Sequence, residues 1–341
     1  MKKVLLIFLS AALVLSAAGC SGKTEQSYRD AYYAGRVLPS EVSPEKGEKR
    51  LEGMADGVLL LPESDDSDPD FLKDTVYAGL FAETQQKVLY LKRPTDKLYP
   101  ASLTKLMTAL LVIEHCRNYD EQVEISEEIM NTGLNVASSL ADLQPGCTYS
   151  VADLLYGLLI PSGNDAANVL AAHIAGSIPD FVDMMNERAQ QLGMFGTHFA
   201  NPHGLHERNH YTTVYDLYLL MKECLKYPMF IGAAGSQDAT VTGHRPDGTT
   251  FQQSYRSTNS YLLGYTVPPA GLKVRCAKTG YTGQAGRCLV LVTQDADKNF
   301  FISVVAKADT YDNLFLQTNR LLALAAGIDP DAPEETKGNG A

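Results

Sequence analysis

The sequence lacks several features that mark whole classes of protein. Its 341 residues carry a net charge of −11 and contain no long block of Lys or Arg. This argues against nucleic-acid binding, because contacts to phosphates need clustered cations. Five cysteines follow Cys20, and none forms a CxxC pair or a cluster with metal-ligand spacing. Because five is odd, they cannot all pair internally, and we expect most of them to be buried free thiols.

Long apolar runs are also scarce, and the one at the amino end is short. The stretch from Val4 to Leu15 follows two lysines and is apolar for about 12 residues, which is too short to cross about 30 Å of hydrocarbon. We interpret residues 1–19 as a signal peptide. The small residues before Cys20 resemble a lipobox, after which the cysteine becomes lipidated and N-terminal. We therefore predict export, with the chain held at the outer face of the cytoplasmic membrane by a lipid on Cys20; ordinary signal cleavage is the alternative.

The rest of the chain divides by composition into a tether, a folded region and a tail. Residues 20–74 are polar, interrupted by Pro and Gly and acidic at their end, which is typical of a flexible tether. Residues 75–328 carry helix and strand patterns, and residues 329–341 are interpreted as a frayed tail. Strands are expected first and last with helices between them, so the two ends of the folded region should meet in one sheet. The expected strands are residues 77–81, 87–91, 273–278, 287–293 and 300–305. The expected helices are residues 151–160, 166–175, 181–192 and 311–326. The first three of these helices fall in a largely helical region from residue 102 to residue 225.

A serine and a lysine lie one helical turn apart at the start of an apolar helix. From Ser102 to Ile113 the pattern predicts a helix that is apolar nearly all round and hence buried. Ser102 begins this helix, where free backbone N–H groups favour a developing anion. Lys105 shares a helical face with Ser102, and burial lowers the pKa of a lysine, so its neutral amine can take the hydroxyl proton. A second Ser-x-x-Lys, from Ser43 to Lys46, lies in the polar tether without such a helix and is set aside.

Two further short motifs carry groups that could complete such a site. The segment Ser162–Asn164 forms a turn between two apolar helical stretches, where a hydroxyl and an amide can relay protons and hold a peptide group. The segment Lys278–Gly280 ends an expected strand and precedes Tyr281. A lysine and a threonine hydroxyl can hold a carboxylate, and glycine lets a substrate backbone come close. The segment Ser257–Asn259 also fits Ser-x-Asn, but it lacks the paired helices and ranks lower.

The three motifs, in this order, resemble those of the serine penicillin-recognising enzymes. The longer segments that contain or flank these motifs are similar to those of the D-alanyl-D-alanine carboxypeptidases, the low-molecular-weight penicillin-binding proteins. These segments are Ala101–Lys105, Pro161–Ala166, Asn201–Leu205 and Lys278–Thr282. The resemblance covers residues 75–328. It implies an α/β (α+β) fold of the serine β-lactamase and DD-peptidase type, with an antiparallel sheet flanked by helices, an all-helical subdomain, and the site between them.

The resemblance also implies a role for each motif residue. Ser102 would be the nucleophile and Lys105 the base for acylation, while the backbone N–H groups of Ser102 and Tyr281 would form the oxyanion hole. Lys278 and Thr279 would hold the terminal carboxylate of the substrate. The implied catalytic residues are Ser102, Lys105 and Ser162, and the implied substrate-binding residues are Asn164, Lys278, Thr279, Gly280 and Tyr281.

The implied reaction removes the terminal D-Ala from peptidoglycan stem peptides through an acyl-enzyme on Ser102. β-Lactams would be covalent inhibitors, and no metal or cofactor is required. The sequence departs from the family in two ways. Residues 308–319 contain no Arg, although some members use one there to bind the carboxylate, so this binding would rest more on Lys278 and Thr279. The chain also ends soon after Lys278, so we expect neither the C-terminal β-rich domain nor the anchor helix of many members, and the lipid would replace that anchor.

Three other functions compete with this interpretation. A class A-like β-lactamase would need a deacylating Glu, and Glu187 lacks the Glu-x-x-Leu-Asn surroundings. A non-hydrolytic β-lactam sensor or peptidoglycan-binding lipoprotein is disfavoured because a mere binder has little use for a buried base. A DD-endopeptidase would use the same three motifs, so this function remains an alternative. His203 lies in a turn-forming Asn-Pro-His-Gly string, and without the partners of a Ser-His-Asp triad we expect it to be structural.

Overall fold

The structure is a computed structural model that describes residues 59, 61 and 70–330 of the chain. All of these residues fall in the second of the two units into which the chain divides, residues 52–341. The predicted signal peptide, Cys20, most of the predicted tether and residues 331–341 of the predicted tail lie outside the described residues. Within the described part, no helix is long and apolar enough to cross a membrane.

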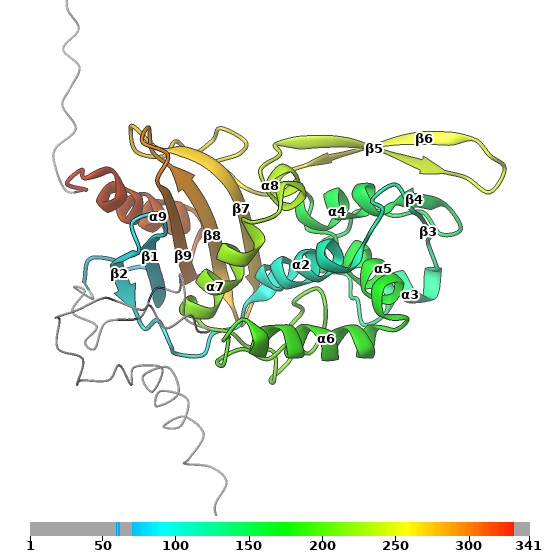
Figure 1. Ribbon diagram of the computed structural model, residues 1–341, viewed down its shortest axis with the longest axis horizontal. Helices are drawn as coiled ribbons and strands as arrows, with labels where there is room; N and C mark the ends of the chain where they lie inside the picture. Colours follow the sequence, from blue (N-terminus) through cyan, green and yellow to red (C-terminus); the bar gives the residue numbers. More distant parts are fainter. Residues whose placement is uncertain (1–58, 60, 62–69, 331–341) are drawn as a thin grey trace, which may run out of the picture. The chain divides into compact units, whose positions relative to one another are not determined.

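Strands from the two ends of the described region meet in a five-stranded antiparallel sheet, as the sequence predicts (Figure 1). Its strand order is β2-β1-β9-β8-β7, so β7 is an edge strand. The first and last strands pair directly, with Tyr77 opposite Ala306 and Ala82 opposite Phe301. The strands are β1 (Tyr77–Ala82), β2 (Lys87–Lys92), β7 (Lys273–Thr282), β8 (Gly286–Gln294) and β9 (Phe300–Ala308).

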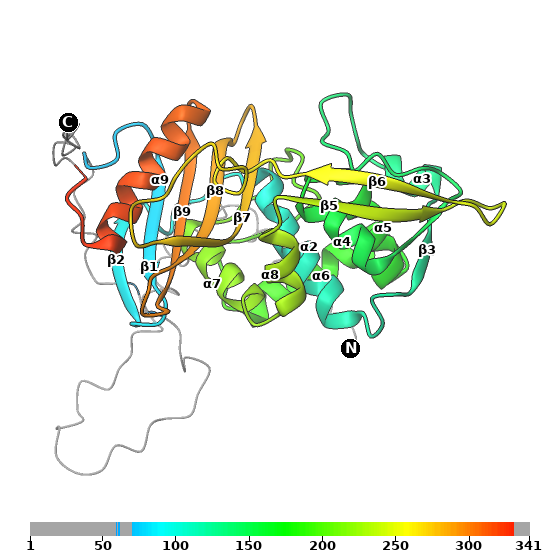
Figure 2. The same cartoon turned by 90° about the horizontal axis from the view of Figure 1, so that it is seen from above.

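Two helices, α7 (Val214–Cys224) and α9 (Tyr311–Ala326), cover opposite faces of this sheet (Figure 2). This arrangement follows from the alternation of side chains along β1. A Cβ atom on Gly79 would lie 2.7 Å from Cγ1 of Val214, so glycine at this position lets α7 approach the sheet. The β1 residues that join the apolar cluster with α9 are Ala78, Leu80 and Ala82.

The helices between the outer strands match the predicted helical region, although the first begins differently. Ser102 lies in a short 3-10 helix, η1 (Ala101–Thr104), which runs directly into α2 (Lys105–His115). α2 is buried from Lys105 to Ile113, as its apolar sequence predicts. The remaining helices are α3 (Glu127–Asn131), α4 (Val151–Leu159), α5 (Asn164–Ala175), α6 (Ile178–Gln191) and α8 (Pro228–Ala234).

A second sheet, which the sequence pattern did not predict, lies among these helices. It has four strands in the order β3-β4-β5-β6, so the subdomain expected to be all-helical also carries a small sheet. Two of its strands are too short to show a period. The other two are rich in polar residues and bury few of their side chains fully. They therefore lack the apolar alternation that marks a strand. The strands are β3 (Gln122–Glu124), β4 (Thr148–Ser150), β5 (Asp238–His244) and β6 (Thr250–Arg256).

The five cysteines of the described region are free thiols, and four of them are buried, as predicted. Burial raises the pKa of Cys276 to about 12 and that of Cys288 to about 11, because a thiolate is poorly solvated inside a protein. Cys116 is the partly exposed thiol of this set, and it caps the carboxyl end of α2. These thiols therefore behave as small apolar side chains, with Cys116 the exception.

Candidate active site

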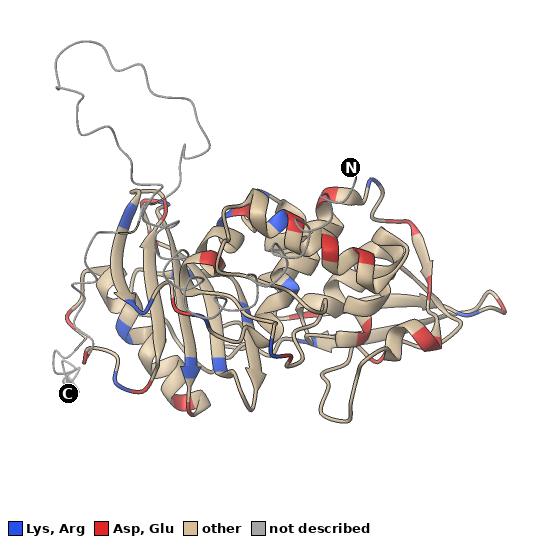
Figure 3. Ribbon diagram, turned by 90° about the horizontal axis from the view of Figure 1, so that it is seen from below, with Lys and Arg blue, Asp and Glu red and all other residues tan. Residues whose placement is uncertain are grey.

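Two buried lysines set this region apart from the rest of the molecule. Figure 3 shows Lys and Arg interspersed with Asp and Glu along the described ribbon. Lys105 and Lys278 differ from these other cations because their exposed fractions are 0% and 1%. Lysine is almost never fully buried unless it is paired. The surroundings of these two side chains therefore define the candidate site.

Lys105 lies against the hydroxyl of Ser102, as the helical spacing predicts. Its Nζ is 3.0 Å from Ser102 Oγ, 2.6 Å from Asn164 Oδ1 and 2.8 Å from the carbonyl oxygen of His203. The contact with Asn164 joins two motifs, because these residues lie 59 positions apart in the sequence. The third contact comes from the loop at residues 201–205, for which the sequence predicts no chemical role.

Burial sets the protonation state of Lys105. Desolvation lowers the pKa of Lys105 well below 10.5, and the second buried lysine lowers it further. A neutral amine has two N–H groups and one lone pair. The three partners of Lys105 suit this form, because the oxygens of Asn164 and His203 can accept the two N–H groups while the lone pair faces the Ser102 hydroxyl. Lys105 is therefore placed to remove the hydroxyl proton.

The second buried lysine holds Ser162. Lys278 Nζ donates to Ser162 Oγ over 2.8 Å and to the Thr279 carbonyl over 3.1 Å, and desolvation lowers the pKa of Lys278 to about 7. Ser162 lies between α4 and α5 with a φ of +67°, which is uncommon for a residue other than glycine. Strained backbone of this kind clusters at functional sites. Because Asn164 of the same turn reaches Lys105, one turn connects both lysines.

The edge strand β7 forms the opposite wall of the site. It continues to Thr282, so the motif Lys278–Tyr281 lies inside the strand, not at its end as the sequence predicts. A Cβ atom on Gly280 would lie 3.1 Å from the backbone nitrogen of Ser102, so glycine lets the strand pack directly against η1. Since β7 has a partner on one side only, its outer backbone groups can bind an extended chain next to Ser102.

A side chain of β7 contacts the segment Ser257–Asn259, which ranks low as a motif on its sequence alone. Thr279 Oγ1 lies 2.6 Å from Thr258 Oγ1, so the segment Ser257–Asn259 borders the site through its central residue. Tyr281 is 51% exposed, and its ring stands at the open end of the motif. The structure thus brings every predicted site residue of the three motifs into one region.

The loop at residues 201–205 also belongs to this region. Burial lowers the pKa of His203 to about 3, and its Nδ1 accepts the backbone N–H of Leu205 over 3.2 Å. The ring is therefore neutral and supports the loop, while the carbonyl of the same residue binds Lys105. The sequence predicts a turn here, but it does not predict the contact with Lys105, because every residue type has a backbone carbonyl.

Gly204 in this loop is expected to tolerate no side chain. Its φ is +92°, and a Cβ atom would lie 1.9 Å from the Ala101 carbonyl oxygen, next to the nucleophile. We expect Gly204→Ala to lower the free energy of unfolding by roughly 2–4 kcal/mol, measured by urea denaturation. Gly133→Ala is the matched control, because Gly133 has a φ of +68° with open space around it and should lose only about 1 kcal/mol. Equal losses in the two variants would contradict a role for the contact with Ala101.

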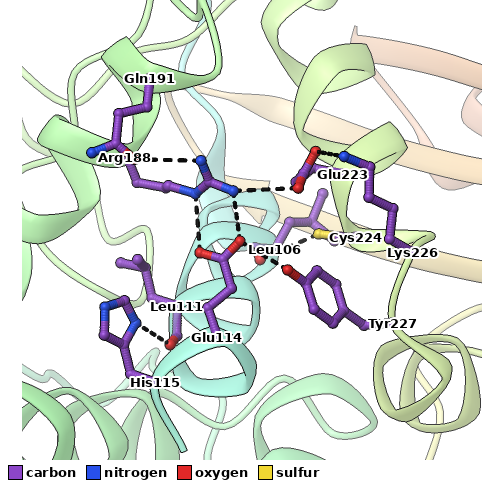
Figure 4. Close-up of polar contacts among 10 residues, drawn as sticks. All are labelled: Leu106, Leu111, Glu114, His115, Arg188, Gln191, Glu223, Cys224, Lys226 and Tyr227. Carbon is purple, nitrogen blue, oxygen red and sulfur yellow. Dashed lines mark hydrogen bonds and ion pairs between the residues drawn. The ribbon is translucent and has the colours of Figure 1, made fainter. Parts of the chain in front are cut away.

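A cluster of charged residues fixes the far end of α2 (Figure 4). Arg188 of α6 donates to both carboxylate oxygens of Glu114, over 3.0 and 2.6 Å, and to Glu223 of α7 over 3.3 Å. Tyr227 donates its hydroxyl to the same Glu114 over 3.1 Å. Bidentate pairs between arginine and carboxylate define geometry as well as energy. The carboxyl end of α2 is thereby tied to two other helices, which stabilises the position of Ser102 at its amino end.

Comparison with known proteins places the chain in a family. The sequence model of a family described as D-alanyl-D-alanine carboxypeptidase matches residues 77–310, a range that includes all three motifs. The chain belongs to the D-alanyl-D-alanine carboxypeptidase family. This agrees with the resemblance carried by the motifs, and it rests on most of the described region.

Relatives within the D-alanyl-D-alanine carboxypeptidase family have more than one named activity. The D-alanyl-D-alanine carboxypeptidase DacF of Bacillus subtilis is 34% identical over 250 residues, which cover 73% of this chain and 61% of the relative. The D-alanyl-D-alanine endopeptidase of Escherichia coli is 30% identical over 236 residues, which cover 69% of this chain and 72% of the relative. The matched region spans 57–61% of the length of three curated carboxypeptidases of the family.

Solved structures of D-alanyl-D-alanine peptidases share the fold. The DD-transpeptidase of Streptomyces K15 superposes with a TM-score of 0.69 at 25% identity, covering 75% of this chain and 98% of that chain. Penicillin binding protein 5 from Haemophilus influenzae superposes with a TM-score of 0.64 at 29% identity, covering 74% and 71%. The predicted DD-peptidase fold is confirmed.

Lys278 should make the stability of this family member depend on pH. Its pKa is about 7 in the folded protein and 10.5 in the unfolded chain, so the unfolded chain binds the proton more tightly. Stability therefore rises with pH between 7 and 9, by about 1 kcal/mol per pH unit from this group. Lys278→Met should remove that part of the rise, as measured by urea unfolding of both proteins at pH 7, 8 and 9. Parallel stability curves for the two proteins would contradict the assignment.

Proposed function

We propose that this protein is a serine DD-carboxypeptidase that removes the terminal D-Ala from peptidoglycan stem peptides and is acylated by penicillin. The observation that carries the proposal is the 3.0 Å contact between the desolvated Lys105 amine and the Ser102 hydroxyl, beside an unpaired strand edge. Family membership and the names of the carboxypeptidase relatives support the choice of substrate.

Acylation begins with the neutral amine of Lys105. The amine takes the proton of Ser102 Oγ, and the oxygen attacks the carbonyl carbon of the penultimate D-Ala. The substrate lies along the free edge of β7, where Gly280 allows a close approach. The backbone N–H groups of Ser102 and Tyr281 stabilise the negative oxygen of the tetrahedral intermediate, and one such donor is typically worth about 2.7–4 kcal/mol.

Release of D-Ala requires a proton on the departing amine. Ser162 is held by Lys278 through its Oγ, and its hydroxyl hydrogen can pass to the departing amine. The proton that Lys105 took from Ser102 replaces it, so that Lys105 is neutral again and Lys278 keeps its own protonation state. A water molecule then attacks the ester on Ser102, and its proton returns through Lys105. The products are the shortened peptide and the free Ser102 hydroxyl.

The proposal is tested by assaying D-Ala release from an N-acylated peptide that ends in L-Lys-D-Ala-D-Ala. The purified full chain in mild detergent should release D-Ala, and penicillin should block the release. Mass spectrometry should find the penicilloyl group on the peptide that contains Ser102. A folded protein that neither releases D-Ala nor reacts with penicillin would refute the proposal.

A DD-endopeptidase is the second candidate, and the names of two relatives favour it. The Escherichia coli relative and a Pseudomonas aeruginosa relative that is 33% identical over 209 residues are both named D-alanyl-D-alanine endopeptidase. Cross-linked muropeptides separate the two candidates. Faster cleavage of the cross-linked dimer than of the linear peptide would favour the endopeptidase.

We also propose that the protein is exported and held at the outer face of the cytoplasmic membrane by a lipid on Cys20. The support is the sequence alone, namely the cationic start, the short apolar run and the small residues before Cys20. Radiolabelled palmitate should label the wild type in cells, and Cys20→Ala should remove the label and release the protein from the membrane. Equal membrane retention of the variant would refute the lipid anchor.

A further inference from the structure

Ala101, the residue before the nucleophile, has an uncommon backbone conformation. Its φ is +48°, a left-handed value that few residues other than glycine adopt. Strained backbone of this kind persists only where the surrounding structure holds it in place. The groups that contact the backbone of Ala101 therefore also determine the position of Ser102.

The peptide unit between Ala101 and Ser102 connects this strained backbone to the oxyanion hole of the proposed mechanism. A trans peptide unit is planar, so its C=O and N–H bonds point in opposite directions. The Ala101 carbonyl oxygen lies against the loop at residues 201–205, where a Cβ atom on Gly204 would be 1.9 Å from it. The Ser102 nitrogen lies beside β7, where a Cβ atom on Gly280 would be 3.1 Å from it. Holding the carbonyl in place therefore also fixes the direction of the Ser102 N–H.

A buried hydroxyl group binds this carbonyl. Thr104 is 1% exposed, and its Oγ1 donates to the Ala101 carbonyl oxygen over 2.8 Å. A threonine in a helix often donates to a preceding carbonyl in this way. Thr104 differs from such a threonine because a second group holds its hydroxyl: Nε2 of His210, 106 positions further along the chain, lies 2.8 Å from the same oxygen.

The contacts of His210 fix the direction of these hydrogen bonds. His210 is 1% exposed, and its Nδ1 accepts the backbone N–H of Ala200 over 3.2 Å. Burial lowers the pKa of His210 to about 3, so the ring is neutral and carries its one hydrogen on Nε2. Nε2 therefore donates to Thr104 Oγ1, and the hydroxyl hydrogen of Thr104 points to the Ala101 carbonyl. The three groups form one directed chain of hydrogen bonds.

We propose that His210 and Thr104 are positioning residues that hold the Ala101 carbonyl and thereby aim the Ser102 N–H at the negative oxygen of the tetrahedral intermediate. The inference rests on the proposed function, and it assigns the residues that orient one donor of its oxyanion hole. This donor acts mainly when negative charge develops on the substrate oxygen. Loss of the chain should therefore lower the rate of the chemical steps more than the affinity for the substrate.

The test measures the acylation rate and, separately, the fraction of protein that penicillin finally labels. Thr104→Val removes the hydroxyl and keeps the branched shape of the side chain. Its acylation rate and its kcat for D-Ala release should fall by roughly 10- to 100-fold, with KM unchanged. The final labelled fraction should equal that of the wild type, because Ser102 and Lys105 are both present. Thr104→Ser keeps the hydroxyl and should restore most of the rate.

Thr318→Val is the matched control for the loss of a buried hydroxyl. Thr318 is 0% exposed, and its hydroxyl donates to the backbone carbonyl of Leu314 in α9 over 2.7 Å. This variant should lose a similar amount of stability and keep the wild-type rate.

His210→Phe tests the other end of the chain. It removes both ring nitrogens and keeps an aromatic ring beside Phe199, whose ring centre is 5.7 Å away. Acylation should slow in this variant as well. The double variant Thr104→Val/His210→Phe should be no slower than the slower single variant, because residues that act through one chain of contacts are not additive.

The inference is supported if Thr104→Val is slow but fully labelled, its KM is normal, and Thr104→Ser restores the rate. It is overturned if Thr104→Val reacts at the wild-type rate, if Thr104→Ser is equally slow, or if Thr318→Val slows as much. If Thr104→Val does not fold, His210→Phe takes its place, and a wild-type rate in that variant overturns the inference. Failure of the proposed function is distinguishable, because the wild type itself would then neither release D-Ala nor react with penicillin.

Discussion

Replacing Ser102 with alanine is expected to abolish both covalent labelling by penicillin and release of D-Ala. The side chain supplies the oxygen that forms the acyl bond, and no described hydroxyl other than Ser102 Oγ contacts the Lys105 amine. Loss of a nucleophile removes the covalent route entirely, so the turnover number should fall by about 10⁴-fold or more. Fluorescent penicillin on a denaturing gel, together with the D-Ala assay, measures both effects.

Ser43→Ala is the matched control for this experiment. Ser43 begins the second Ser-x-x-Lys of the chain, so the same substitution tests whether the motif alone is sufficient. Labelling should be lost in Ser102→Ala and retained in Ser43→Ala. Persistent labelling of Ser102→Ala would place the nucleophile elsewhere in the chain.

Replacing Lys105 with methionine should give the second large effect, a loss of acylation in a protein that still folds. The amine is the base that contacts Ser102, and a general base typically contributes about 10²–10⁴-fold to the rate. Methionine fills a similar volume without a buried amine, while Asn164 and His203 each lose a donor. These opposing changes should leave the melting temperature close to that of the wild type. Stopped-flow measurement of penicillin acylation gives the rate.

The pH dependence distinguishes a base from a merely structural lysine. Because the pKa of Lys105 is well below 10.5, the acylation rate of the wild type should rise with pH as the amine loses its proton and then level off. Lys105→Met should be slow at every pH and lack this rise. Lys46→Met, in the second Ser-x-x-Lys, should behave as the wild type does. A normal pH profile in Lys105→Met would rule out Lys105 as the base.

The sequence predicted those parts of the site that depend only on the type of a residue and on its spacing from a second residue in the same element. The contact from Lys105 to Ser102 follows from helical spacing, and the burial of Lys105 follows from the apolar residues around it. The pairing of β1 with β9 follows from strands at both ends of the folded region. The turn at Ser162–Asn164 was likewise expected between two helices, and the structure brings it to both buried lysines.

The features that escaped prediction depend on backbone atoms or on contacts between distant strands. The carbonyl of His203 binds Lys105, and any residue type would offer that carbonyl. The polar strands β5 and β6 pair along their full length, but this pairing is a property of two segments, not of either one alone. Arg287 lies over the ring of Tyr281 because β8 pairs with β7, and its neighbours in sequence do not indicate this contact.

The single accessible thiol of the described region gives the catalytic helix a chemical handle at each end. Cys116 caps the carboxyl end of α2, and Ser102 precedes its amino end. The rise along the intervening helical residues separates them by roughly 20 Å. A maleimide dye on Cys116 and a fluorescent penicillin on Ser102 would therefore form a donor–acceptor pair across one rigid element, and their energy transfer would report acylation in real time.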